Sequence, residues 1–157
     1  MAQPQPVDAP GVVAFPPLIF AAILALELFC HTIVQVELSP PFKFRVAGSI
    51  LAIVAGATAL SAALTMRRAG TNINPARPAL AIVTAGPYRF TRNPMYLALC
   101  LLNLGIGLLL CDLIPVLLTL ALFLVLHYGV ILREERYLEK KFGPVYSSYK
   151  ARVRRWL

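Results

Sequence analysis

The chain has 157 residues, of which 59% are hydrophobic and 14% are charged. Soluble domains carry about 25% charged residues, so this composition excludes an ordinary soluble domain and indicates an integral membrane protein. The net charge of +8 is unevenly spread, because no lysine or arginine precedes Lys43.

The apolar runs predict an all-α membrane protein with about four transmembrane helices, each needing roughly 20 apolar residues. A Pro-rich lead-in, 1–14, is expected to be disordered. The first two spans are predicted at 15–36 and 44–66, and the Ala and Gly content of the second suits close helix packing. A shorter third span, 95–111, and a fourth, 113–132, form a hairpin around a tight turn at Asp112 and Pro115.

The fourth helix is expected to continue beyond the membrane as a C-terminal helical extension. Lys140 and Lys141 fall in its last turn, and Gly143-Pro144 ends it. Its final third then carries Glu134 and Glu135 into water.

The distribution of lysine and arginine predicts the orientation in the membrane. Five of these residues lie in 67–94 and eight lie after the fourth span, whereas the connection between the third and fourth spans has none. Both rich segments follow an even-numbered span, so both termini are expected in the cytoplasm of a multi-pass protein of the bacterial inner membrane or its equivalent. The three cysteines show no metal-ligand or disulfide spacing, and no metal site is expected.

The loop before the third span has the most informative sequence, Gly86-Pro87-Tyr88-Arg89-Phe90-Thr91-Arg92-Asn93-Pro94-Met95-Tyr96. Gly86-Pro87 indicates a turn, and Asn93-Pro94 indicates a helix start. Free N–H groups at that helix start favour an anion, and Arg92 beside them could hold a carboxylate. The alternative is a basic loop with interfacial tyrosines that only sets the orientation.

A second polar stretch, 133–146, begins where the fourth span meets water. Acidic residues do not contribute to topology there, so Glu134 and Glu135 imply a partner, expected among the arginines of the Arg92 loop or of the C-terminal tail. The alternative is a solvated helix end with ordinary ion pairs along its surface.

Together, the loop sequence above and Glu134-Glu135-Arg136-Tyr137-Leu138-Glu139-Lys140-Lys141-Phe142-Gly143-Pro144-Val145-Tyr146 resemble the isoprenylcysteine carboxyl methyltransferase and phospholipid methyltransferase superfamily. The resemblance covers 85–153 and implies that 67–157 forms a methyltransferase core, preceded by two helices in 15–66. Members of this superfamily use S-adenosyl-L-methionine.

The resemblance also implies roles for single residues. Catalytic roles fall to Arg92, Glu134 and Glu135, and binding of a substrate carboxylate falls to Arg92 and Arg152. Cofactor contacts are expected at Tyr88, Asn93, Pro94, Tyr96 and His127, although His127 could equally make a polar contact inside the bundle. At Asn93 many members have histidine, and an amide cannot titrate, so acid–base work at this position is not expected.

The leading hypothesis is S-adenosylmethionine-dependent carboxyl O-methylation of a lipidic, prenylcysteine-like molecule. One alternative is N-methylation of a phospholipid or small amine, in which Glu134 or Glu135 would remove a proton. Another is a non-catalytic membrane interaction protein. The expected partners are the bilayer and a lipidic or small-molecule acceptor, and not nucleic acid.

Polar residues inside the first span have a structural interpretation. Glu27, His31 and Gln35 share one helix face, and Asn103 lies in the third span. We expect hydrogen bonds between helices rather than a second functional site.

Overall fold

The computed structural model describes residues 8–157, and prolines start four of its helices. These are α1 (Pro16–Ile33), α2 (Pro41–Arg68), α3 (Pro94–Leu110) and α6 (Pro144–Arg152). Proline suits a first helical position because its fixed φ is helical and its missing N–H would have no partner there. In contrast, α4 (Leu113–Leu126) is capped by Asp112, the residue before it, whose side chain accepts a hydrogen bond from the N–H of Ile114 at 3.0 Å.

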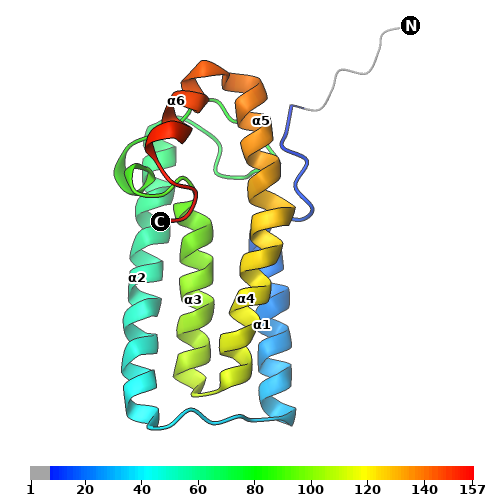
Figure 1. The fold of residues 1–157 in the computed structure, drawn as a ribbon, viewed down its shortest axis with the longest axis vertical. Coiled ribbons are helices and arrows are strands. Elements are labelled where there is room, and N and C mark those ends of the chain that lie inside the picture. The colour runs from blue at the N-terminus through cyan, green and yellow to red at the C-terminus, as the bar shows by residue number, and fades with distance from the viewer. Residues whose placement is uncertain (1–7) are drawn as a thin grey trace, which may run out of the picture.

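The long helices form a bundle in which α3 packs along α2, and α4 packs against both α3 and α1 (Figure 1). The contact between α2 and α3 depends on two small residues. A Cβ atom added to Gly48 would lie 2.6 Å from the carbonyl oxygen of Gly105, so the two backbones approach as closely as glycine allows. This confirms the close packing expected for the second span at Gly48.

Three helices are long and apolar enough to cross a membrane: Pro16–Ile33, Pro41–Arg68 and Leu113–Phe142. The shorter apolar helix α3 has 17 residues, as its short apolar run predicts. The expected all-α membrane fold is therefore confirmed, and the count of four spans depends on whether α3 crosses the bilayer.

Hydrogen bonds join the helices inside the bundle. Asn103 of α3 donates to the carboxylate of Glu27 on α1 and to the hydroxyl of Thr119 on α4. His31 lies 2.8 Å from Asp112 at the turn between α3 and α4, whereas Gln35 is exposed. These contacts agree with the interpretation of the first-span polar residues as interhelical hydrogen bonding.

The helix that starts at Leu113 runs to Phe142, with one change of winding. A π-helical segment, η2 (His127–Ile131), separates α4 from α5 (Leu132–Phe142). The left-handed backbone of Gly143, with φ +50°, then turns the chain into α6. The predicted helical extension is thus two helices, and the C-terminal segment 153–157 returns toward the start of α3 (Figure 1).

The predicted disordered lead-in covered 1–14, and its first seven residues lie outside the described residues. Residues 8–14, which we call the N-terminal strap, pack on η2 and α5. The N–H of Val13 donates to the carbonyl of Gly129 at 3.2 Å, and the guanidinium of Arg133 donates to the carbonyl of Gly11 at 3.0 Å. This part of the lead-in therefore has a defined position, set by backbone contacts.

Candidate active site

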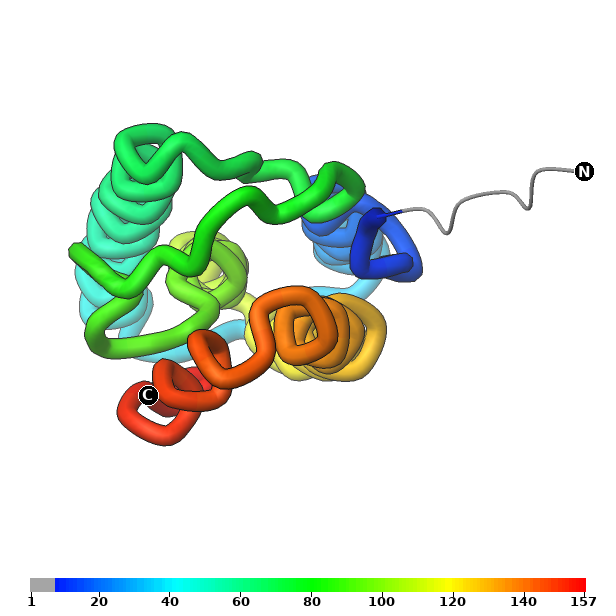
Figure 2. The backbone as a smooth tube through the Cα atoms, turned by 90° about the horizontal axis from the view of Figure 1, so that it is seen from above, coloured from blue at the N-terminus to red at the C-terminus, as the bar shows by residue number. Residues whose placement is uncertain are grey.

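A cavity lies at the end of the bundle that carries α5, α6 and the loop between α2 and α3. Seen from above in Figure 2, that loop crosses from α2 toward α1 and returns to α3. The cavity is enclosed by this loop, by the start of α3 and by α5. Its volume is about 130 Å³.

The turn that leads into α3 is fixed by local geometry. A short 3₁₀ helix, η1 (Gly86–Arg89), begins at a glycine with φ +57°, and a Cβ there would lie 2.7 Å from the hydroxyl of Thr65. The N–H of Asn93 then donates to the Thr91 hydroxyl at 3.2 Å. Glycine is needed at position 86 both for its positive φ and for its lack of a side chain.

The C-terminal segment holds this turn in place. The N–H of Arg92 donates to the carbonyl of Arg154 at 3.0 Å. The carbonyl of Arg155 accepts from the Thr91 hydroxyl at 3.1 Å and from the side-chain amide of Asn93 at 2.9 Å. Three consecutive residues before α3 are therefore anchored to two residues at the end of the chain.

The side chains of the same segment contact α4, η2 and α5. The indole N–H of Trp156 lies 3.1 Å from Nδ1 of His127, and its ring packs on Phe123 with centroids 4.7 Å apart. Arg155 donates to both carboxylate oxygens of Glu135, at 2.9 and 2.8 Å. The tail thus joins the Arg92 turn to α4, η2 and α5.

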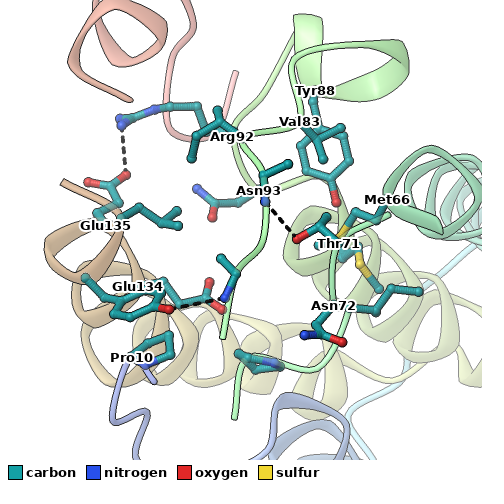
Figure 3. A pocket seen from close by; sticks show the side chains of 18 of the residues that line it. Pro10, Met66, Thr71, Asn72, Val83, Tyr88, Arg92, Asn93, Glu134 and Glu135 are labelled. Carbon is teal, nitrogen blue, oxygen red and sulfur yellow. Dashed lines mark hydrogen bonds and ion pairs between the residues drawn. The ribbon is translucent and has the colours of Figure 1, made fainter. Parts of the chain in front are cut away.

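Glu135 is the centre of a buried charge cluster. Nη1 of Arg92 lies 3.1 Å from Oε1 of Glu135, and the two side chains are only 7% and 6% exposed (Figure 3). Arg155 binds the same carboxylate from the other side. The expectation that an arginine of the loop or of the tail pairs with the acidic residues is confirmed for Glu135, which pairs with one arginine from each, and not for Glu134.

Glu134 has a different environment from its neighbour. Its carboxylate accepts a hydrogen bond from the Tyr96 hydroxyl at 2.8 Å, and it has no ion pair with a lysine or arginine among residues 8–157. It lines the cavity together with Tyr96. The cavity therefore contains one carboxylate neutralised by two arginines and one whose side-chain partner is uncharged.

Tyrosine side chains form much of the remaining wall. Tyr88, Tyr146 and Tyr149 are all buried, and the Tyr149 hydroxyl donates to the carbonyl of Tyr88 at 2.7 Å. Burial, with a smaller contribution from Glu135, raises the pKa of Tyr146 to about 12, and burial also raises the pKa of Tyr88 and Tyr149. These hydroxyls consequently stay neutral near pH 7 and present polarisable ring faces and O–H donors.

Arg92 has one donor that the described residues leave free. Its Nη1 contacts Glu135 and, at 3.4 Å, the Tyr146 hydroxyl. Its Nε is buried without a hydrogen-bond partner among residues 8–157. A buried unpaired donor is costly, so it is a point at which a bound molecule could add an interaction.

Most of the residues predicted from the sequence line this one cavity. They are Tyr88, Arg92, Asn93, Pro94, Tyr96, Glu134 and Glu135. His127 does not line it and instead contacts Trp156, which corresponds to the polar contact considered as its alternative. Asn93 uses its amide N–H to hold the tail, so its position is structural as well as cavity-lining.

Arg152 is not brought to the cavity. It is exposed at the last turn of α6, where its Nε donates to the carbonyl of Ser148 at 3.2 Å. Since α6 ends at Arg152 and the chain then reverses, the arginine that reaches the carboxylates is Arg155. We expected Arg152 at the site, and the structure instead places Arg155 beside the carboxylates.

One wall of the cavity was not predicted from the sequence. The loop after α2 contributes ten lining residues between Thr71 and Val83, including Thr71 and Asn72. It is held by the Thr71 hydroxyl, which accepts from the N–H of Leu80 at 3.0 Å, and by the Tyr137 hydroxyl, which accepts from the N–H of Ala79 at 3.2 Å. A sequence signal for this wall is the polar pair Thr71-Asn72 shortly after the end of α2, and both side chains are among those that line the pocket in Figure 3.

The sequence is similar to known proteins. The chain is similar to a Haemophilus influenzae protein described as uncharacterized, with 46% identity over 63 residues, which is 40% of this chain and 100% of that protein. The family model for phospholipid methyltransferase matches residues 44–145, more than half of the chain, from the start of α2 to the start of α6. This chain belongs to the phospholipid methyltransferase family, within the superfamily that its loop and α5 sequences resemble.

Proposed function

We propose that the cavity is the reaction centre of an S-adenosylmethionine-dependent methyltransferase, at the cytoplasmic end of a membrane bundle. The observation that carries the proposal is the contact between Arg92 and Glu135, 3.1 Å apart, which joins the turn before α3 to α5 around one cavity. Membership of the family supports methyl transfer as the reaction. The concentration of lysine and arginine at this end of the bundle supports its cytoplasmic position.

The residues present fit the cofactor, which would supply an electrophilic methyl group on a positively charged sulfur. Tyr88, Tyr96 and Tyr146 offer ring faces that attract a cation, and the Glu134 carboxylate, whose pKa burial raises to about 7, adds a negative charge in its ionised form. Met95 and Tyr96 lie in the first turn of α3, where backbone N–H groups lack intrahelical partners and favour a carboxylate. One cavity therefore has groups for both charged ends of an amino-acid sulfonium.

The chain contributes mainly by positioning. Methyl transfer is an in-line displacement, so alignment of donor and acceptor supplies much of the rate advantage. Anchoring of Arg92 and Asn93 by the C-terminal segment, together with the Arg92–Glu135 pair, keeps the two walls of the cavity in register. Asn93 cannot titrate, which leaves the carboxylates as the groups able to accept a proton.

The charges of the cavity favour an amine acceptor over the lipidic carboxylate that we expected first. Arg92 is already paired with Glu135, so a carboxylate would have to compete for it. Glu134 has no cationic partner among the described residues, and it lies where it could accept the proton that an ammonium group loses before attack. A phospholipid or small amine is thus the better-supported acceptor, and carboxyl O-methylation becomes the second candidate.

Two measurements on the purified full chain test the proposal. Binding of S-adenosylhomocysteine should be detected in the micromolar range by calorimetry, and absence of binding to folded protein at millimolar ligand would reject it. With methyl-labelled S-adenosylmethionine, acceptors are then screened for incorporated label. Label stable to base indicates an amine and base-labile label indicates an ester; cofactor binding without transfer to any lipid or amine tested would favour the non-catalytic alternative.

A matched pair of variants links the activity to this cavity. Glu134→Gln removes the charge of a cavity residue at nearly constant shape, and Glu139→Gln removes the charge of a residue paired with Lys150 on the surface. Only Glu134→Gln should abolish transfer. Equal activity in both variants would exclude Glu134 from the reaction.

A further inference from the structure

The outer face of α5 differs in charge from the face that lines the active-site cavity. Glu134 and Glu135 line the cavity, whereas four cations of the same helix lie outside it. These are Arg133, Arg136, Lys140 and Lys141, and all four are exposed. Together with residues 8–11 of the N-terminal strap they line a groove of their own, which we call the basic groove.

Most of the positive charge in the basic groove is not neutralised by the protein. Asp8 is its acidic residue, and it is already bound by Lys141 and by the Tyr137 hydroxyl, at 2.6 and 2.7 Å. Within the part of the chain that the structure describes, Arg133 and Arg136 donate only to backbone carbonyls, those of Gly11 and Leu132. Lys140 makes no hydrogen bond or ion pair within residues 8–157. Three cations are therefore available to an anion.

The position of the groove relative to the membrane indicates which kind of anion it would bind. The apolar helix from Leu113 to Ile131 comprises α4 and η2, with 14 and 5 residues. At 1.5 Å per residue it is about 28 Å long, close to the hydrocarbon thickness of a bilayer of about 30 Å. Arg133 therefore lies where the helix leaves the hydrocarbon core, at the level of lipid phosphate groups.

An exposed apolar side chain lies beside the groove on its membrane side. Val13 of the strap is 62% exposed, and its N–H donates to the carbonyl of Gly129 in η2, one turn before Arg133. A basic groove next to an exposed apolar side chain matches an amphiphile with an anionic head. Basic clusters immediately beyond a membrane span have this character when they bind anionic lipids.

We propose that the basic groove binds the headgroup phosphate of an anionic phospholipid from the adjacent leaflet. The strap and α5 form the two walls, and Arg133, Arg136 and Lys140 supply the charge. Pro10 and Tyr137 line both this groove and the active-site cavity, so a lipid held here would stand beside the place where an acceptor enters. The proposal concerns lipid binding and does not require that methyl transfer occur.

The test uses the full chain in neutral detergent and titrates short-chain phosphatidylglycerol, with bound lipid counted by native mass spectrometry. In the triple variant Arg133→Gln/Arg136→Gln/Lys140→Gln, the lipid concentration for half-occupancy should rise by roughly tenfold or more, since each cation contributes to attraction. The matched control is Arg67→Gln/Arg68→Gln/Arg89→Gln, which removes three exposed cations elsewhere at the same end of the molecule. It should change half-occupancy by less than about twofold.

Two further variants should shift the affinity for phosphatidylglycerol in opposite directions. Asp8→Asn removes the acidic residue of the groove and should tighten phosphatidylglycerol binding. Lys140→Gln alone, which breaks no contact within residues 8–157, should weaken it measurably in protein that elutes as the parent chain does, even if the triple variant fails to fold. The proposal would be overturned if the control triple variant weakened phosphatidylglycerol binding as much as the groove variant does. It would also be overturned if millimolar inorganic phosphate and phosphatidylcholine displaced the bound lipid equally well.

Discussion

The guanidinium of Arg155 and the carboxylate of Glu135 form a two-point ion pair, with N–O distances of 2.9 and 2.8 Å. The pair connects the last few residues of the chain to α5, although the family match ends at residue 145. Because Arg92 shares the same carboxylate, the C-terminal segment is part of the candidate site and not an appendage to it.

We expect Arg155→Lys to weaken S-adenosylmethionine binding by about tenfold, because an ammonium group cannot reproduce the two-point geometry that positions Glu135. Arg152→Lys is the matched control, since Arg152 is exposed and contacts only a backbone carbonyl of its own helix. Calorimetric titration of both variants measures the effect. If the Arg152 variant lost as much affinity as the Arg155 variant, the assignment of the tail arginine would be reversed.

Arg92→Ala should lower the free energy of unfolding by about 1–3 kcal/mol, because it removes one of the two guanidinium groups that neutralise the buried Glu135 carboxylate and leaves the other in place. The change in the double variant Arg92→Ala/Glu135→Ala should be smaller than the sum of the two single changes, since both single changes remove the same Arg92–Glu135 contact. Unfolding in mixed detergent–denaturant micelles gives all three values. Simple additivity would show that the two side chains are energetically independent.

Glu134→Gln should discriminate between two ligands that differ in charge. S-adenosylmethionine has a positive sulfur and S-adenosylhomocysteine has a neutral one, so removing a nearby carboxylate weakens mainly the first. We expect about a tenfold loss of affinity for S-adenosylmethionine and less than about a twofold change for S-adenosylhomocysteine. An equal loss for both ligands would mean that Glu134 acts through the shape of the cavity and not through its charge.

Gly48→Ala should destabilise the bundle by about 1–3 kcal/mol, because the added Cβ would lie 2.6 Å from the backbone oxygen of Gly105 on α3. Gly56→Ala is the control on the same helix, since a Cβ there meets no atom within 4 Å. Only the first variant should lower the midpoint of thermal unfolding in detergent. Comparable stability of both would show that α2 and α3 can separate without cost.

The helices themselves were predictable from the sequence with little error. Apolar runs predicted α1 and α2 to within a few residues, Asn93-Pro94 marked the start of α3, and Gly143-Pro144 marked the end of α5. Local signals suffice here because a membrane span requires a continuous apolar stretch and a proline fixes its own φ. The π-helical winding of η2 has no comparable local signal, and its residues His127 and Gly129 contact segments far away in the chain.

The partner of the acidic residues was predictable in kind but not in identity. Two carboxylates at the end of a span predicted cationic partners, and arginines were available in the loop and in the tail, although only Glu135 pairs with them and Glu134 is bound by the Tyr96 hydroxyl. Which arginine of the tail reaches Glu135 depends on where α6 ends and how the chain reverses after Arg152. That reversal brings residues 20 positions apart into contact, and no local pattern contains such a relationship.

The sequence alone determined that this protein is an α-helical membrane protein with a basic end, and its loop and α5 sequences indicated the kind of chemistry. Those properties follow from composition, local backbone preference and the side chains of short segments. Only the tertiary structure decided that Arg155 and not Arg152 completes the charge cluster, that residues 71–83 enclose the cavity, and that α5 separates an acidic cavity from a basic groove. These features depend on distances between segments far apart in the chain, which are set by packing of the whole bundle.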